Sequence, residues 1–148
     1  MTSVAVTSDT GLPAPSEELA LLLRGGAAAP RRARTAVVSW LESALADSQR
    51  WNIALIISEL VTNSVVHAKV DSERTLAVEA VRSGDRLLIA VTDPGSQHEP
   101  HVAPHADRKH EHLGLFLVSK LSSGWGFERD QIGTTRVWCE FPLDSVGV

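Results

Sequence analysis

The segment WNIALIISELVTNSVVHAK, residues 51–69, is strongly apolar and carries Glu59, Asn63 and His67 at intervals of four. At about 100° per residue, that interval places the three side chains along one flank of a helix. Apolar residues border this polar row on both sides: Ile53, Ile56, Ile57, Leu60, Val61 and Val65 on one, Leu55 and Val66 on the other. A carboxylate and an amide in such a place cost free energy unless they are satisfied. The row therefore needs partners in the neighbouring backbone, in solvent or in a ligand, and spacing alone does not decide among them.

The composition bounds the class of protein. The 148 residues, 43% of them hydrophobic, suffice for one domain with a substantial core. A net charge of −4 and a pI of about 5.8 argue against a broad nucleic-acid-binding surface. Cys139 is the only cysteine, so no intrachain disulfide can form, which fits a reducing cytoplasm. No apolar run approaches the ~20 residues that span a bilayer, and the N-terminus lacks a signal-peptide pattern. We expect a cytoplasmic protein without direct nucleic-acid or membrane contacts.

Two elements are expected before the central helix. Residues 1–16 are rich in Thr, Ser, Pro and Gly and predict a disordered tail, followed by one domain over residues 17–148. The run LALLLR, residues 19–24, is short and stops at two glycines, which favours a strand. Residues 31–46 have apolar side chains at helical spacing and predict an amphipathic helix. Asp47 and Ser48 supply capping residues for the central helix, which runs to about residue 68.

The chain beyond the central helix predicts two pairs of strands, separated by a loop and a short helix. Residues 75–82 and 86–92 form a hairpin, whose second strand stops at Asp93, Pro94 and Gly95. Residues 113–121 predict a short buried helix, and residues 125–128 and 134–141 predict the last two strands. This order predicts an α+β two-layer sandwich, with helices on one face of a mixed, largely antiparallel sheet.

The intervening loop, residues 96–112, has almost no apolar residue and contains His98, His101, His105, His110 and His112. Their spacings match no tight pair of metal ligands, and no cysteine or carboxylate cluster supports them. A polar, mobile lid is therefore favoured over a zinc site. A third interpretation is that the histidines contact phosphate groups, increasingly as the pH falls through about 6.5.

Several of these features suit a magnesium nucleotide. A carboxylate at the end of a buried strand, here Asp93, can accept a hydrogen bond from an exocyclic amine such as that of adenine. The glycine that opens the next buried helix, Gly114, offers unpaired helix N–H groups to phosphates. Asn63 can complete the oxygen shell of a Mg²⁺ ion that keeps several waters. Glu59, one turn away, can act as a general base on a water or hydroxyl.

These motifs, in this order, resemble the Bergerat-type ATP-binding fold of DNA gyrase, heat-shock chaperones and sensor histidine kinases. ELVTNSVVHA (59–68) is similar to the first box of that family, and VTDPG (91–95) to its adenine box. LGLFLV (113–118) is similar to its second glycine box, and GTTRVW (133–138) to its closing strand. The resemblance covers residues 19–143 and is most specific to the small bacterial anti-sigma factor serine kinases and their actinobacterial relatives.

The resemblance implies a role for each matching residue. Glu59 is implied as the general base, Asn63 as the Mg²⁺ ligand and Asp93 as the residue that reads the adenine. Gly95 is implied to let the base approach the backbone closely. His67 is expected to orient its neighbours or to border the helix rather than to catalyse.

The phosphate box and the closing strand complete the implied site. Gly114 and Leu115 are implied to bring helix N–H groups to the phosphates, and either Thr134 or Thr135 to bond near the adenine. The register does not choose between the two threonines. The family pattern expects two further glycines at positions occupied here by Gln97 and His112. Glycine serves there because it accepts unusual φ and ψ and leaves room for a phosphate.

The implied function is a regulatory switch that binds ATP and Mg²⁺. It would sequester a sigma factor and phosphorylate a serine or threonine of an anti-sigma factor antagonist, with a homodimer as the implied assembly. The missing glycines leave a second hypothesis open, a module that binds nucleotide weakly or not at all and regulates its partners by contact. A third is a stand-alone catalytic domain serving a separate histidine-bearing protein. Phosphoryl transfer to a partner, and calorimetry with Mg-ATP, distinguish these hypotheses.

Overall fold

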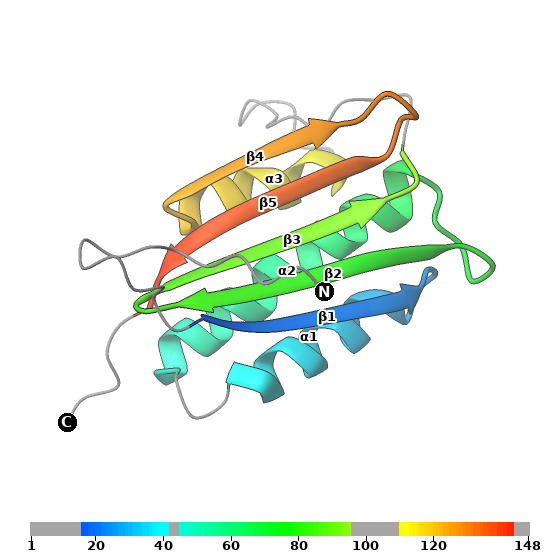
Figure 1. Cartoon of the computed structure of the whole chain (residues 1–148). Helices are drawn as coiled ribbons and strands as arrows, with labels where there is room; N and C mark the ends of the chain where they lie inside the picture. Colours follow the sequence, from blue (N-terminus) through cyan, green and yellow to red (C-terminus); the bar gives the residue numbers. More distant parts are fainter. Residues whose placement is uncertain (1–15, 42–44, 96–109, 144–148) are drawn as a thin grey trace.

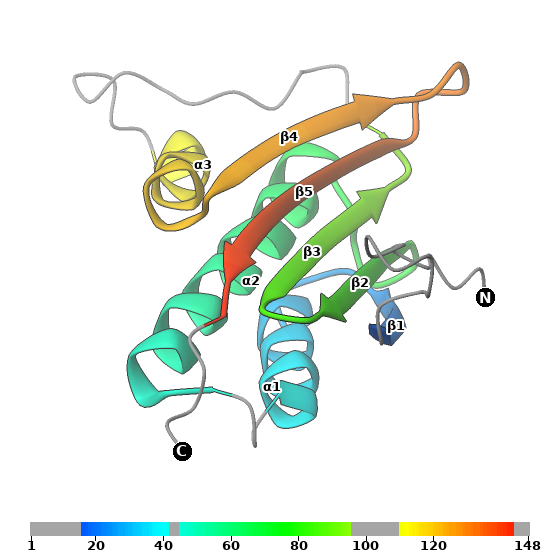
Figure 2. The same cartoon turned by 60° about the vertical axis from the view of Figure 1, so that its left-hand side comes forward.

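The computed structural model describes residues 16–41, 45–95 and 110–143, and within these ranges it forms two layers (Figures 1 and 2). One layer is a five-stranded sheet in the order β1-β2-β3-β5-β4, and the other contains the helices. The elements are β1 (Ser16–Arg24), α1 (Ala29–Leu41), α2 (Asp47–His67), β2 (Thr75–Ser83), β3 (Arg86–Asp93), α3 (His110–Leu121), β4 (Gly124–Arg129) and β5 (Thr135–Pro142). The α+β sandwich with helices on one face is therefore confirmed.

The sheet is antiparallel at each of its four described pairings, which corrects the expected mixed sheet. The β2–β3 hairpin turns through Gly84 and Asp85 between the paired residues Ser83 and Arg86. Gly84 has a φ of 59°, as a tight turn with a left-handed first central residue requires. The chain then crosses through α3 and β4 before β5 returns beside β3 in the opposite direction.

The core lies between the sheet and the inward faces of α1 and α2. Helix α2 contributes Ile53, Ile56, Ile57, Leu60 and Val61, each at most 2% exposed. The facing strands contribute apolar residues at every second position, as a half-buried sheet requires: Val78 and Ala80 of β2, Ile89 and Val91 of β3, Val137 and Cys139 of β5. Helix α1 buries Ala29, Ala33, Val37 and Leu41 at helical spacing. The apolar part of the 51–69 segment is thus the centre of the core.

The start of α2 differs from the sequence-based expectation. The N-cap residue is Ala46, which has extended backbone angles and makes no capping hydrogen bond through its side chain. Asp47 and Ser48 are already inside the helix, so the prediction that they cap it was wrong. Gln49 instead donates from its side chain to the carbonyl of Pro142 at 3.2 Å, which joins this end of α2 to the end of β5.

The end of α2 is closed by a left-handed residue. Lys69 has a φ of 53°, and the N–H of Val70 donates to the carbonyl of Val65 at 3.2 Å. This is the hydrogen-bond pattern of a Schellman cap, and the residue after the left-handed position, Val70, is buried as that motif prefers. Gly25 packs directly on Val70, where a Cβ would lie 1.9 Å from the Val70 carbonyl oxygen. The two glycines after β1 therefore hold the β1–α1 connection against the end of α2.

Other boundaries shift by a few residues. Helix α1 begins at Ala29 and its described part ends at Leu41, whereas Leu45 and Ala46 lie outside any helix. Ser16, assigned to the tail, is the first residue of β1. Helix α3 begins at His110 rather than at residue 113. The rest of the predicted tail, and the loop histidines His98, His101 and His105, lie outside the described residues. No helix in the described part of the chain is both long and apolar enough to cross a membrane.

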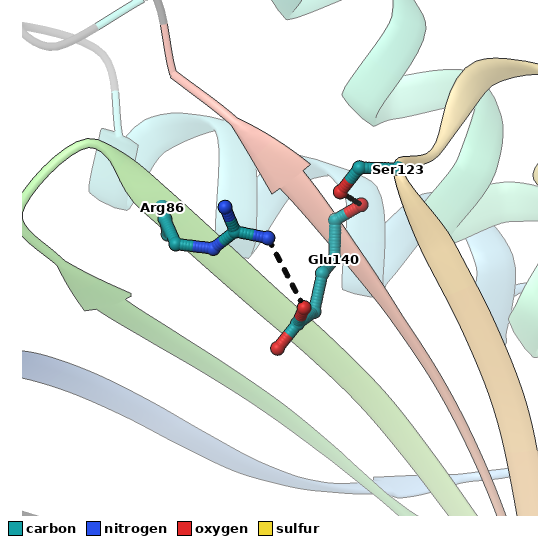
Figure 3. A network of polar contacts seen from close by, with 3 residues as sticks. All are labelled: Arg86, Ser123 and Glu140. Carbon is teal, nitrogen blue, oxygen red and sulfur yellow. Dashed lines mark hydrogen bonds and ion pairs between the residues drawn. The ribbon is translucent and has the colours of Figure 1, made fainter. Parts of the chain in front are cut away.

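Polar contacts join Arg86 at the start of β3, Glu140 of β5 and Ser123 between α3 and β4 (Figure 3). The Arg86 guanidinium contacts the Glu140 carboxylate at 3.3 Å between paired strands β3 and β5. The Ser123 hydroxyl, just after α3, donates to the Glu140 carbonyl at 2.9 Å, and its backbone N–H donates to the same oxygen at 2.8 Å. Because both ionic side chains are exposed, the ion pair contributes little to stability. The two hydrogen bonds from Ser123 attach the connection between α3 and β4 to β5.

Candidate functional site

Asp93 is the buried carboxylate of the site and the last residue of β3, with 6% of its surface exposed. The N–H of Gly95 donates to its Oδ1 at 2.8 Å, which holds the side chain in place. Burial raises the pKa of the Asp93 carboxyl above its usual value. The Ser64 hydroxyl, the Gly95 N–H and the positive charges of Arg129 and Arg74 lower this pKa, but less than burial raises it. The Asp93 carboxylate is thus a hydrogen-bond acceptor that is largely shielded from solvent.

Thr135 lies directly across from Asp93. The two residues are partners in the β3–β5 pairing, and Thr135 is 3% exposed. The Nε–H of Arg129 donates to the Thr135 hydroxyl oxygen at 3.3 Å, from the adjacent strand β4. Thr134 precedes the strand, and its backbone N–H donates to the Asp130 carboxylate at 2.9 Å to close the β4–β5 turn. Of the two candidate threonines, Thr135 is therefore the one beside Asp93.

A glycine is required at position 95 because the Gly133 carbonyl lies where a side chain would be. Its φ is +105°, and a Cβ added there would lie 1.8 Å from the carbonyl oxygen of Gly133. The turn after β3 therefore packs against the turn before β5 with no space for a side chain. This contact brings together the VTDPG and GTTRVW motifs, which are about 40 residues apart in the sequence. The role expected for Gly95, close approach of a base, stays a prediction.

Glu59 and Asn63, in the polar row of α2, have no partner among the residues that the structure describes. Glu59 and Asn63 are both half-buried, and neither has a hydrogen bond or ion pair to any group that the structure describes. Burial raises the pKa of the Glu59 carboxyl above its usual value. The interpretation that neighbouring backbone satisfies these side chains is therefore not supported for the described residues. His67 ends α2, and its side chain lies outside the described set.

Ser64 is a site residue that the sequence did not single out. It is 1% exposed, and among the described residues its hydroxyl has no hydrogen bond of ordinary geometry, although it lies close enough to Asp93 to lower the pKa of that carboxyl. A buried hydroxyl without a full partner is costly, which is the signature of a site completed by a ligand or a water. Its position next to Asn63 was the available signal. Ser64 has the helical spacing of a core position, so the sequence alone does not mark it as a site residue.

Two arginines near Asp93 were also missed. Arg74, in the connection between α2 and β2, donates to the Ala68 carbonyl at 3.2 Å, and its charge lowers the pKa of Asp93. The charge of Arg129, in β4, also lowers the pKa of Asp93. Neither position follows from a motif, because their proximity to Asp93 depends on the end of α2 and on the register of β4.

The phosphate-binding part is only partly described. Gly114 and Leu115 lie in the second turn of α3, since that helix begins at His110 and not at Gly114. The free N–H groups of a helix belong to its first four residues, here 110–113, so the anion-binding end lies one turn earlier than expected. The backbone places both residues in the helix; the phosphate contacts expected of them stay a prediction.

The donor set fits a magnesium nucleotide. Asn63 offers a neutral oxygen of the kind that completes a Mg²⁺ shell, and Glu59 offers a carboxylate one helical turn away. The buried Ser64 hydroxyl and the Asp93 carboxylate offer polar contacts at the buried end. No group of three or more His, Cys, Asp or Glu side chains that could hold a metal occurs among the described residues. A zinc site in the histidine-rich loop falls largely outside them.

Comparisons with known proteins agree with this architecture. Residues 26–138 match the family model of the histidine kinase-like ATPase domain. The fold is similar to the crystal structure of the RsbU and RsbW domains of Rv1364c from Mycobacterium tuberculosis, with a TM-score of 0.65 and 25% identity. That similarity covers 89% of this chain and 33% of the other, so the chain spans about a third of that protein's length. A search among curated proteins found no significant match.

Proposed function

Because the chain belongs to the histidine kinase-like ATPase family, we propose that it is an ATP- and Mg²⁺-binding regulator with protein kinase activity of the anti-sigma factor type. It binds a sigma factor and phosphorylates a serine or threonine of an anti-sigma factor antagonist. The structural neighbour contains a domain named RsbW, which supports this subtype. The resemblance of the four sequence motifs to anti-sigma factor kinases supports it independently. A cytoplasmic homodimer is part of the same proposal.

The pairing of Asp93 with Thr135 is the observation that carries the proposal. Two polar side chains lie opposite each other at the buried end of a sheet, one a carboxylate and the other a hydroxyl. A carboxylate accepts from the amino group of adenine, and a hydroxyl can donate to a ring nitrogen beside it. Ser64 adds a second polar contact on the α2 side of Asp93.

The α2 row supplies the groups that the chemistry needs. Mg-ATP, when bound, supplies a terminal phosphate whose charge the metal neutralises. Asn63 holds the metal, and helix N–H groups at the start of α3 hold phosphate oxygens. Glu59 takes the proton of the attacking hydroxyl. Burial raises the pKa of the Glu59 carboxyl, so its carboxylate is a stronger base than an exposed one.

Phosphoryl transfer and nucleotide binding are measured separately to test the proposal. Purified protein is incubated with labelled Mg-ATP and its candidate antagonist, and calorimetry measures Mg-ATP binding by the wild type and by Asn63→Ala. We expect label on a serine or threonine of the antagonist, and a weaker binding heat for the variant. Normal nucleotide binding without label transfer would sink the kinase assignment.

A second candidate function is favoured by Gln97 and His112, which replace glycines of the family pattern. Each adds a side chain where close approach of a phosphate or a flexible turn is expected. This alternative is a module that regulates partners by contact alone. It predicts no calorimetric heat with Mg-ATP, or a heat that Asn63→Ala leaves unchanged.

A further inference from the structure

Three residues form a row across the inner face of the sheet at the candidate adenine end. Arg129 of β4 is the partner of Thr135 in β5, and Thr135 is the partner of Asp93 in β3. The Nε–H of Arg129 donates to the Thr135 oxygen at 3.3 Å. The Thr135 hydroxyl can donate to the carbonyl of Gly133 at 3.4 Å, which is long for an O–H···O bond.

The Arg129 contact determines which way the Thr135 hydroxyl can serve a ligand. A hydroxyl has one hydrogen and two lone pairs, whereas a guanidinium only donates. With Arg129 donating to the oxygen, the hydroxyl hydrogen must point away from Arg129. Its bond to Gly133 is weak, so the hydrogen is available to a better acceptor. The contact thereby favours Thr135 as a donor to a ligand, beside the acceptor Asp93.

A donor beside an acceptor matches adenine and opposes hypoxanthine. Adenine has an amino donor next to a ring nitrogen that accepts. Hypoxanthine has a carbonyl acceptor next to a ring N–H donor, so both groups are reversed. A site whose buried polar groups are aimed for one pattern leaves them unpaired with the other. With Arg129 on one lone pair of the Thr135 oxygen, accepting from the ring N–H would use the second lone pair and leave the hydrogen on its long bond to Gly133. Without Arg129, both lone pairs are available to the ring N–H, so hypoxanthine is disfavoured less.

We propose that Arg129 is a positioning residue that sets base selectivity, by holding the Thr135 hydroxyl as a donor beside Asp93. The inference rests on the proposed nucleotide-binding function and adds to it the group that disfavours the hypoxanthine pattern. Arg129 is itself exposed.

The chain offers a matched control for the loss of an arginine. Arg136 follows Thr135 directly and therefore points to the opposite face of the sheet, where it lies 3.8 Å from Glu79. Arg136→Met and Arg129→Met remove the same charge from neighbouring strands. Only the second removes a donor from Thr135.

The test measures the dissociation constants of ADP and IDP, each with Mg²⁺, by calorimetry on the full chain. The variants are Arg129→Met, Arg129→Lys, Arg136→Met, Thr135→Val and the double variant of Arg129→Met with Thr135→Val. We expect the wild type to bind ADP more tightly than IDP. Arg129→Met should reduce the ratio of the IDP dissociation constant to the ADP dissociation constant about tenfold, which corresponds to the loss of one hydrogen bond. Arg129→Lys should recover part of the ratio, and Arg136→Met should keep all of it.

The double variant separates positioning from a general charge effect. If Arg129 acts through Thr135, Arg129→Met changes the ratio no further once Thr135 is valine. An unchanged ratio in Arg129→Met, or an equal change in the Thr135→Val background, overturns this inference while nucleotide binding stands. Absence of ADP binding by the wild type overturns the proposed function and this inference with it.

Discussion

Replacing Gly95 by alanine tests how the two turns of the site are joined. An alanine there must adopt a φ near +105° and place its Cβ 1.8 Å from the Gly133 carbonyl oxygen. An ordinary contact begins at 3.4 Å, so the turns must separate by about 1.6 Å (3.4 − 1.8) or the backbone must change conformation. The left-handed conformation costs about 1–2 kcal/mol. The steric conflict adds a further ~1–3 kcal/mol, as overpacking does elsewhere.

Gly133→Ala provides the control because it has a similar conformation and different surroundings. Gly133 has a φ of +92°, and an added Cβ would meet nothing within 4 Å. Its substitution should therefore cost the conformational penalty alone. The difference between the two variants isolates the contact between the turns, which we expect to be ~1–3 kcal/mol.

Urea denaturation followed by tryptophan fluorescence measures both free energies of unfolding. Since the separated turns also move Thr135 relative to Asp93, Gly95→Ala should weaken nucleotide binding more than Gly133→Ala does. Equal destabilisation by the two substitutions would refute the reasoning, because it would show that the carbonyl moves aside without cost.

Three further outcomes are expected. Glu59→Ala should abolish phosphoryl transfer and largely spare Mg-ATP binding, whereas Asn63→Ala and Asp93→Ala should weaken binding itself; equal losses of affinity in all three would contradict these roles. Because burial raises the pKa of Asp93 above its unfolded value of 3.8, the stability that this shift contributes is fully present below pH 3.8 and is lost as the pH rises through the raised pKa. In thermal unfolding, the stability of Asp93→Asn relative to the wild type should therefore increase between pH 4 and pH 7. A stability difference that does not change with pH would contradict a raised pKa of Asp93. Ile57→Ala removes a fully buried side chain and should cost ~2–5 kcal/mol in urea denaturation, with a cost under about 1 kcal/mol excluding a central place for it.

The sequence predicted the fold well because its periodicities are strong and local. The 51–69 segment and the alternating strands on either side of Gly84 require only nearest neighbours along one element to be recognised. The helix ends were predicted less well. Asp47 was expected as a cap by its type, but the chain enters α2 one residue earlier, at Ala46. Similarly, α3 gains a turn at His110 that its polar composition did not indicate.

In the candidate site, too, local motifs predicted some residues, whereas others depend on tertiary structure. Motif positions placed Asp93 at the end of its strand, where the structure has it buried. The sequence could not choose between Thr134 and Thr135, because the answer depends on the β3–β5 register, which pairs Thr135 with Asp93. Arg129 and Arg74 approach Asp93 only through tertiary structure, and no local pattern marks such residues. The expected assignments of Gly114, Leu115 and His67 stay predictions.

The β3–β5 pairing also bears on how the protein folds. Two of the four strand pairings, β2–β3 and β4–β5, are local hairpins, whereas Asp93 and Thr135 meet across a pairing of residues 42 positions apart. Closing so long a connection costs more chain entropy than forming either hairpin. A refolding intermediate with both hairpins formed would still lack the site, since half of it belongs to each. Nucleotide would then bind only after the hairpins have docked, and would slow unfolding without speeding the first steps of folding.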